Sequence, residues 1–478
     1  MARLTSNKSS ILLVFLAIFS GLFFGLVSLF YVQLIGDHYI YLAVPLLAFL
    51  IGLLFISDRY AFFFLVIVTR SSLDSAFNAI KIGSFGLGAV LNALVILIAL
   101  LTLLEKPVKL NVDLSSLKRA WLLFLGLAFL SIFYAPSLVS SIKLFLIYVS
   151  YASIFLLGFY LIKTPDDFGK WMKAIALSSL IPVLYSLFSI AIGGAGLKLY
   201  KYEGLRLQGP FPHANPFSTY LVFITSFFFY LYKSKASFIS DGVRRFLPIY
   251  IFILLGLLLM TKTRSAWAVT YLLFFLYGVF HERKFLIIVF TVPFLALMIP
   301  EIQERVIDLT QGNNFGSTGY ERLNSFAWRL QIWKDSIDWM AKSHYLFGYG
   351  VASFINYSQD FAMANAFQTQ DFDINAHNIY VQTFFELGFF GLIALLYLLS
   401  SYIRTFIKIY KRDSLLVFFL IAIFSQILLQ AITDNLLDYL TVEWYMWFFI
   451  GISISYIVKF KSAKPNNESL NLNKKLKA

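Results

Sequence analysis

The chain has 478 residues, of which 59% are hydrophobic and only 13% are charged, and this balance excludes an ordinary soluble domain. The formal net charge is +14, but Lys and Arg stand mostly in loops on one side of the predicted membrane, so the charge indicates membrane orientation rather than nucleic-acid binding. The sequence has no cysteine, which excludes disulfides and thiol catalysis.

Apolar stretches of roughly 20 residues, the length that crosses a bilayer core, recur along the chain. They predict helices, because a spanning segment must satisfy its backbone hydrogen bonds internally. The short basic stretch Met1 to Ser10 leads directly into the first span and is interpreted as part of a signal anchor. About fourteen spans are predicted, or about twelve if short ones merge, at 11–31, 40–56, 60–69, 84–104, 120–134, 143–162, 171–193, 216–232, 247–262, 265–280, 284–300, 379–402, 414–434 and 439–460. The sequence therefore predicts an all-α polytopic membrane protein.

Lys and Arg residues gather in alternate loops between these spans, for example from Lys163 to Lys173 and from Arg404 to Arg412. The positive-inside rule places such loops in the cytoplasm, and both termini fall on the same side. The opposite, extracytoplasmic side receives the segments 70–83, 194–215, 261–265 and 301–378.

This alternation predicts an organisation in four parts. Residues 1–300 form the first part of a transmembrane bundle, and residues 301–378 form a large extracytoplasmic loop. Residues 379–460 form the C-terminal transmembrane helices, and residues 461–478 form a polar, disordered cytoplasmic tail.

The long loop contains apolar residues at successive spacings of four, three, four and three, which predict an amphipathic helix. These residues are Phe326, Leu330, Trp333, Ile337 and Met340. Such a helix is expected to lie on the outer leaflet or to cap the bundle. Direct contact of Arg322 or Arg329 with a substrate is the alternative. Further along the loop, Gly348-Tyr349-Gly350 predicts a turn.

Two arginines stand on the predicted outer side, against the charge bias. Arg206 lies shortly before a span, and Arg264 lies in a tight turn between two spans. Arginine close to hydrocarbon is costly unless it is paired or functional, and its planar fork suits phosphate oxygens. We therefore predict that both arginines bind a lipid diphosphate, with extension to lipid headgroups as the alternative. Asp434 and Asp438, at the outer end of the last hairpin, are candidates to pair with an arginine.

His377 ends the long loop where the chain re-enters the membrane. Because histidine has an unperturbed pKa of about 6.5, His377 could take a proton from an attacking hydroxyl group. Gly388 and Gly391 follow on the next helix and predict close approach of a neighbouring element. The alternative is a histidine that caps this helix or pairs with an acid such as Asp373.

Four stretches together resemble the motifs of the bacterial O-antigen ligase and polymerase superfamily. They are Arg206-x-x-Gly209 with Pro212-His213-x-Asn215; Thr263-Arg264-Ser265; Arg329 and Trp333 with Gly348-x-Gly350; and His377-Asn378, nine residues, then Gly388-x-x-Gly391. The resemblance covers residues 200–450 in rough terms, and its most specific piece is the histidine motif.

The resemblance implies a GT-C-like fold and a metal-independent, inverting glycosyltransferase that needs no cofactor. The implied donor is an undecaprenyl-pyrophosphate-linked glycan, and the implied acceptor is a hydroxyl group of a glycan or lipid-linked glycan. Transfer would occur at the outer face of the bacterial cytoplasmic membrane. In this resemblance His377 corresponds to the catalytic residue, and Arg206 and Arg264 to the diphosphate ligands. Further candidates for substrate binding are His213, Asn215, Arg329 and Asn378.

The same motifs are typical of ligases, of repeat-unit polymerases of O-antigen, capsule or exopolysaccharide, and of protein O-oligosaccharyltransferases. The close fit of the histidine motif favours the ligase type over the polymerase type. A small-anion transporter is an alternative from another class, although the predicted spans are nearly free of internal charge. The sequence contains no cluster with metal-ligand spacing and no glycine-rich phosphate loop, so neither a metal nor a nucleotide is expected.

Overall fold

The computed structural model describes residues 52–75, 81–82, 85–105, 114–194, 196–200, 204–234, 236–307, 325–364 and 374–461. Some of the sequence predictions lie outside these residues. They are the basic start of the chain, the span 11–31, most of the span 40–56, Arg322, Asp373 and the tail after residue 461.

The chain divides into two compact units, residues 1–67 and residues 68–478. In the first unit, helix α3 (Arg59–Thr69, which ends in the second unit) begins directly after Asp58. The Asp58 carboxylate accepts hydrogen bonds from the backbone N–H groups of Tyr60 and Ala61, both at 3.0 Å. Asp58 therefore caps the start of this helix.

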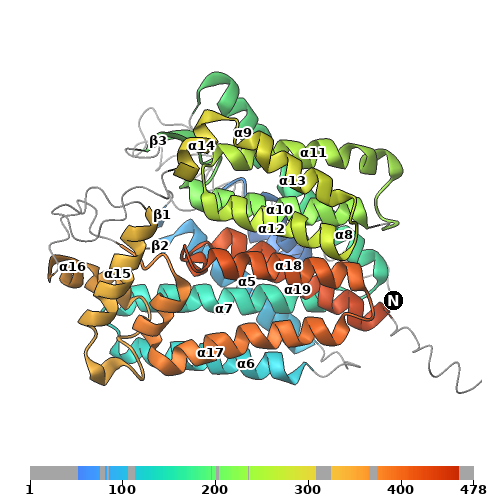
Figure 1. The fold of residues 1–478 in the computed structure, drawn as a ribbon. Helices are drawn as coiled ribbons and strands as arrows, with labels where there is room; N and C mark the ends of the chain where they lie inside the picture. Colours follow the sequence, from blue (N-terminus) through green and yellow to red (C-terminus); the bar gives the residue numbers. More distant parts are fainter. Residues whose placement is uncertain are drawn as a thin grey trace, which may run out of the picture. The chain divides into compact units, whose positions relative to one another are not determined.

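The second unit is built from helices joined by short connections, with two small hairpins (Figure 1). Its elements are β1 (Lys81–Ile82), β2 (Phe85–Gly86), α5 (Leu87–Glu105), α6 (Ser115–Ser131), η2 (Ile132–Tyr134), α7 (Leu138–Leu161), α8 (Pro165–Ser178), α9 (Leu180–Ile192), β3 (Leu197–Tyr200), β4 (Gly204–Leu207), α10 (Ala214–Lys233), α11 (Asp241–Met260), α12 (Arg264–Phe280), α13 (Phe285–Ala296), α14 (Pro300–Ile307), α15 (Ser325–Trp339), η5 (Lys342–His344), α16 (Ser353–Ala364), α17 (Ile379–Ile409), α18 (Ser414–Gln430), η6 (Leu436–Asp438) and α19 (Leu440–Phe460). Strands β1 and β2 pair antiparallel, as do β3 and β4.

Among the described residues, seven helical stretches are long and apolar enough to cross a membrane. They lie in α5, α6 with η2, α7, α8 with α9, α11, α17 and α19, and shorter apolar helices are α3, α12, α13 and α18. This confirms the predicted class, an all-α, multi-pass membrane protein.

Two predicted spans differ from the helices observed. Helix α17 continues to Ile409 rather than ending at residue 402, so Arg404 lies on the helix and not in a loop. The predicted span 171–193 contains two helices, because Pro182 has no N–H to donate to the carbonyl of Ser178. The hydroxyl of Ser71 donates to that carbonyl instead, at 2.8 Å.

Helix α19 forms the centre of the bundle and packs along α7. The two backbones touch where glycines face each other. A Cβ atom on Gly158 would lie 2.8 Å from the carbonyl oxygen of Phe448, and one on Gly451 would lie 2.4 Å from that of Phe155. Small residues let membrane helices approach in this way.

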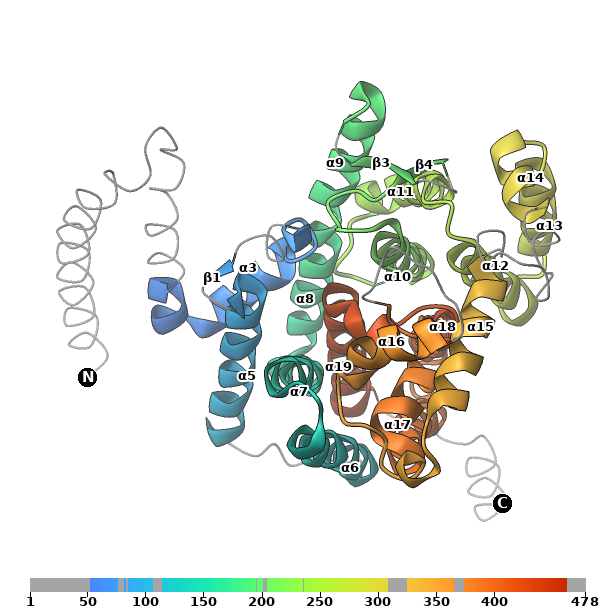
Figure 2. The ribbon, with the colours of Figure 1, turned by 90° about the vertical axis from the view of Figure 1, so that its left-hand side faces the viewer.

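The segments predicted on the outer side lie together at one end of the second unit, where β3, α14, α15 and α16 are seen in Figure 1. They also contact one another. Ser75 donates to the carbonyl of Pro210 at 2.8 Å, and the side chain of Arg206 donates to the carbonyl of Thr261 at 2.7 Å. Viewed along α7 and α10, α15 and α16 cover the near ends of α17 and α18 (Figure 2).

Basic residues of the other set of loops contact helix ends at the opposite end of the bundle. Lys459 donates to the carbonyls of Phe159 and Ile162, at 3.2 and 2.8 Å. Lys233 forms an ion pair with Glu282 at 2.6 Å. The two sets of connections are therefore separated by the length of the helices, as the alternation of Lys and Arg predicts.

The predicted amphipathic helix is present as α15, and part of the predicted stripe packs. Met340, just past the end of the helix, is buried, and Trp333 packs against the same aromatic cluster, which includes Phe385 of α17. Phe326 and Leu330, at the start of the stripe, remain 44% and 37% exposed. The apolar periodicity therefore predicted the packed side of the second half of this helix but not that of its first half.

Candidate active site

His377 and Asn378 have different roles at the start of α17. The side chain of Asn378 accepts hydrogen bonds from the N–H groups of Tyr380 and Val381, at 2.9 and 3.0 Å, and so caps the helix. His377 adopts a positive φ of 46°, and its own N–H donates to the side chain of Asn375 at 3.0 Å. The asparagine therefore holds the helix start, while the histidine directly before it keeps a backbone conformation that is unusual for a residue other than glycine.

The imidazole of His377 pairs with a carboxylate from the hairpin between α18 and α19. Nδ1 of His377 lies 3.0 Å from Oδ1 of Asp434, and the histidine side chain is 28% exposed while that of the aspartate is 8% exposed. This pair was not predicted from the sequence, in which Asp373 was the candidate partner of His377 and an arginine was the candidate partner of Asp434.

Burial by itself would raise the pKa of Asp434, but the hydrogen bond and charge of His377 and the charge of Arg329 outweigh it and lower this pKa to about 2. Asp434 is therefore ionised at neutral pH and has no proton to donate. Nδ1 of His377 must carry the proton in their shared hydrogen bond. The neutral ring then presents Nε2 as an acceptor, the state that a general base requires.

The second oxygen of Asp434 connects the histidine motif to the first arginine motif. Nδ2 of Asn215 donates to Oδ2 of Asp434 at 2.9 Å, and Nη2 of Arg206 donates to Oδ1 of Asn215 at 2.9 Å. Arg206 is only 4% exposed. Its Nε also donates to the carbonyl of Thr261, and its Nη2 to the hydroxyl of Thr263.

Arg264 lies at the first position of α12, facing the elements of the long loop. Its guanidinium donates to the carbonyl of Arg305 at 3.2 Å and to the hydroxyl of Ser325 at 2.6 Å. Arg305 in turn donates to the carbonyl of Lys262, and Arg329 donates to the carbonyl of Ser325. Three arginines from α12, α14 and α15 thus gather near the N-terminus of α12, a location that favours an anion.

A buried polar cluster lies behind the Asp434–His377 pair. Asn435 donates to Oδ2 of Asp438 at 2.6 Å and to Oε1 of Gln382 at 2.8 Å. Burial raises the pKa of Asp438 to about 7, the charge of Asp434 adds to the rise, and the hydrogen bond from Asn435 opposes it. Burial therefore favours the protonated form of this second carboxyl.

One of the two glycines predicted after His377 interrupts α17. Gly388 has φ 66° and ψ −165°, which only glycine adopts without strain. The unwound turn exchanges backbone hydrogen bonds with the segment 345–350, with Phe389 N–H donating to Tyr345 and Gly350 N–H donating to Glu386, both at 2.8 Å.

This crossing needs glycine on both chains. A Cβ atom on Gly388 would lie 2.4 Å from the carbonyl of Leu346, and one on Gly348 would lie 2.4 Å from that of Glu386. The predicted close approach therefore occurs at Gly388, although the neighbour is a segment of turns rather than a helix. At Gly391 a Cβ atom would meet the side chain of Leu387 on the same helix.

The remaining predicted residues lie around this site in different roles. His213 caps α10, because its Nδ1 accepts the N–H of Asn215 at 3.2 Å, and its ring lies 5.0 Å from that of Tyr200. The ring of Trp328, on α15, lies 5.6 Å from that of His377. Trp328 was not among the residues predicted from the sequence, although it directly precedes Arg329.

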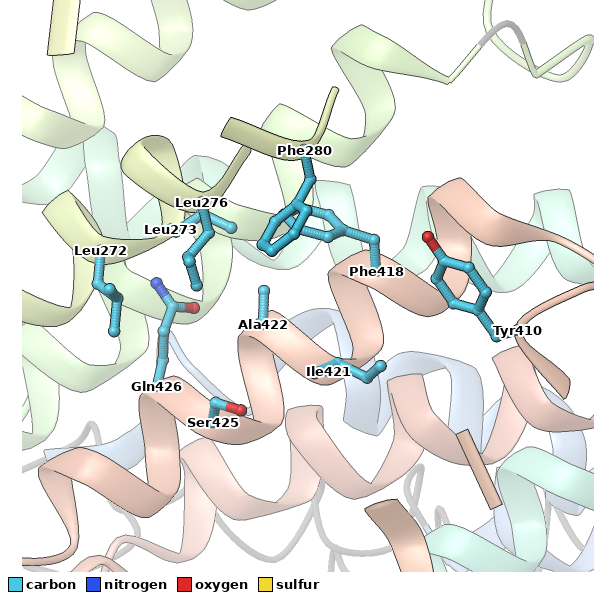
Figure 3. Close-up of a pocket in the computed structure, with 10 residues that line it drawn as sticks. All are labelled: Leu272, Leu273, Leu276, Phe280, Tyr410, Phe418, Ile421, Ala422, Ser425 and Gln426. Carbon is cyan, nitrogen blue, oxygen red and sulfur yellow. The ribbon is translucent and has the colours of Figure 1, made fainter. Parts of the chain in front are cut away.

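A separate groove of about 250 Å³ lies between α12 and α18. Figure 3 shows side chains of both helices pointing into it, mostly leucine and phenylalanine, with Gln426 at one end. The amide of Gln426 bonds to Ser226 and to the carbonyl of Val269. The groove thus offers an apolar lining within the helices rather than reactive groups.

A family model described as O-antigen ligase matches residues 249–396. The matched region includes Arg264, Arg329 and His377, whereas Arg206 precedes it and Asp434 follows it. A search of curated proteins found no match to the chain.

Proposed function

Because the chain belongs to the O-antigen ligase and polymerase superfamily, we propose that it transfers an undecaprenyl-pyrophosphate-linked glycan to a hydroxyl acceptor at the outer face of the bacterial cytoplasmic membrane. The observation that carries this proposal is the pairing of His377 with an ionised, buried Asp434, to which Arg329 of α15 adds positive charge, while Arg264 bonds to Ser325 at the start of the same helix. A base and an anion site are the two parts that such a transfer requires.

In the proposed reaction, Nε2 of His377 takes the proton of the acceptor hydroxyl while its oxygen attacks the anomeric carbon of the donor sugar. The bond from that carbon to the diphosphate oxygen breaks on the opposite face, and the diphosphate leaves with the electron pair. The configuration at carbon is inverted. Asp434 stabilises the imidazolium that forms, and the buried pair needs no metal ion to generate the nucleophile.

Arg264 is the proposed diphosphate ligand. It stands at a helix N-terminus and is less buried than Arg206, and its partners Arg305 and Ser325 come from the predicted extracytoplasmic loop. Arg329 adds positive charge next to Asp434. Together these groups would stabilise the negative charge that grows on the leaving oxygen.

The ligase reading and the polymerase reading share this chemistry and differ only in the acceptor. We favour the ligase type on the fit of the histidine motif and the description of the matching family. Chain-length analysis of carrier-linked glycan in a deletion strain separates them. Loss of a ligase leaves full-length polymer on the carrier lipid, whereas loss of a polymerase leaves single repeat units.

The proposal is tested with the purified full-length protein, a lipid-linked donor and no ion gradient. Wild-type protein should release carrier diphosphate and extend the acceptor in the presence of a chelator. His377→Ala should lower the rate about 10²–10⁴-fold, whereas His281→Ala, at the opposite end of the bundle, should not. Transfer that depends on a divalent cation or on an ion gradient would contradict the proposed mechanism.

A further inference from the structure

Arg206 donates hydrogen bonds to other groups of the protein. It is buried to 4% exposure, and Nε and Nη2 donate to Thr261, Thr263 and Asn215 over distances of 2.7 to 2.9 Å. These contacts hold the guanidinium between the turn before α12 and the start of α10.

Asn215 is oriented by its two neighbours. Arginine can only donate hydrogen bonds, so the amide oxygen of Asn215 must face Arg206. The amide nitrogen must then face Oδ2 of Asp434, as observed at 2.9 Å. The opposite amide orientation would place N–H groups against the guanidinium and leave the carboxylate without this donor.

Asp434 is thereby held at both oxygens. Oδ1 accepts from Nδ1 of His377, with the N–H of Asn435 also at 3.1 Å, while Oδ2 accepts from Asn215. A direct Arg206–Asp434 ion pair would compete with the imidazolium for the carboxylate. The neutral amide of Asn215 fixes the carboxylate without that competition.

We propose that Asn215 is a positioning residue, which acts through Asp434 to hold His377 in its base geometry, and that Arg206 fixes the orientation of the Asn215 amide. This inference rests on the proposed function. Arg206 bonds also to the Thr261–Thr263 turn, from which Arg264 follows, so Asn215 gives the cleaner test.

The test is a double-mutant cycle on the purified full-length protein, with donor and acceptor concentrations varied separately. Asn215→Ala should lower kcat by about tenfold, because it leaves a buried oxygen of Asp434 without its donor, and should change the donor KM by less than about twofold. In an Asp434→Ala background the same substitution should have almost no further effect, because the group through which Asn215 acts is gone. Single-turnover measurements give the rates of the slow variants.

Asn215→Asp keeps the shape of the side chain but places a carboxylate where the donor stood, and should be at least as impaired as Asn215→Ala. Asn356→Ala, at an exposed asparagine of α16, is the matched control and should retain wild-type kinetics. Effects that multiply in the cycle, or a raised donor KM with unchanged kcat, would overturn the inference and indicate direct substrate contact. An inactive wild-type protein would overturn the proposed function, and this inference with it.

Discussion

At the scale of single residues, the site depends on contacts between side chains that lie far apart in the sequence. Sequence analysis identified His377, Asn378 and both arginines, because these types are unusual at the outer ends of apolar spans. It could not identify the partner of the histidine. Asp434 lies 57 residues further along the chain and stands four residues from Asp438, a second acid of the same type. Only the folded hairpin brings one of them to the imidazole.

Substitution of Asp434 tests the assigned tautomer. An amide in Asp434→Asn can donate to Nδ1 of His377 and so favour the ring with its proton on Nε2, which cannot accept a proton from the acceptor. We expect kcat to fall about 10²–10⁴-fold with little change in the amount of folded protein. Asp360→Asn, at an exposed acid on α16, should behave as wild type. Retention of full transfer activity by Asp434→Asn would show that the carboxylate has no part in the reaction.

Arg264 gives a second prediction at this scale. Lysine keeps the charge but loses the planar fork that bonds to Arg305 and Ser325. Arg264→Lys should therefore remain strongly impaired, with donor KM raised or kcat lowered by at least about tenfold. Steady-state kinetics with varied donor measure this. Full activity with lysine would mean that charge alone suffices.

The raised pKa of Asp438 predicts a pH dependence of stability. Between its unfolded pKa, about 3.9, and its folded pKa of about 7, the folded protein binds a proton that the unfolded chain has released. The contribution of this residue to stability therefore falls as pH rises through that window. Asp438→Asn should raise the melting temperature in detergent by clearly more at pH 8 than at pH 5. An equal shift at both pH values would contradict the assignment.

At the scale of elements, the crossing of α17 with the segment 345–350 sets the position of the site. The glycine spacing predicted a close approach, and the structure places that approach at an unwound turn in α17. The direction of α15 was harder to predict. Its apolar stripe is visible in the sequence, but only the later members Trp333 and Met340 pack against the aromatic cluster, and which part of a stripe is covered depends on where the partner helix lies.

Gly388→Ala tests the crossing. The added methyl group would collide with the carbonyl of Leu346 at 2.4 Å, and the backbone would keep its positive φ only under strain. We expect a loss of at least about 1–3 kcal/mol of stability, together with loss of transfer. Gly126→Ala on α6, where a Cβ atom would meet nothing within 4 Å, is the matched control and should be neutral or slightly stabilising. Thermal unfolding of both variants in one detergent compares them.

At the scale of the whole molecule, the pattern of basic residues was a better guide to the arrangement of the helices than single residues were to the contacts in the site. The alternation of basic loops correctly divides the connections between the two ends of the bundle, since it depends on many residues and tolerates errors at any one. Helix ends were less predictable, as α17 and the break at Pro182 illustrate, because hydropathy measures burial in lipid and not hydrogen bonding.

The predicted orientation has a direct test in this cysteine-free chain. A cysteine at Gln359, exposed on α16, should react with a membrane-impermeant thiol reagent in intact cells or spheroplasts. A cysteine at Lys411, exposed at the opposite end of the bundle, should react only after lysis. The reverse pattern would invert the topology and place the site in the cytoplasm.

The pairing of His377 with Asp434 also has a consequence for how the protein is made. The base lies before α17, whereas its carboxylate follows α18, so synthesis must pass the turn after α18 before the two can meet. A nascent chain that has inserted everything up to α17 already displays the arginines and the histidine, yet it lacks the group that fixes the proton on Nδ1. Competence would therefore arise in a single late event during biogenesis, when the final hairpin enters the bilayer.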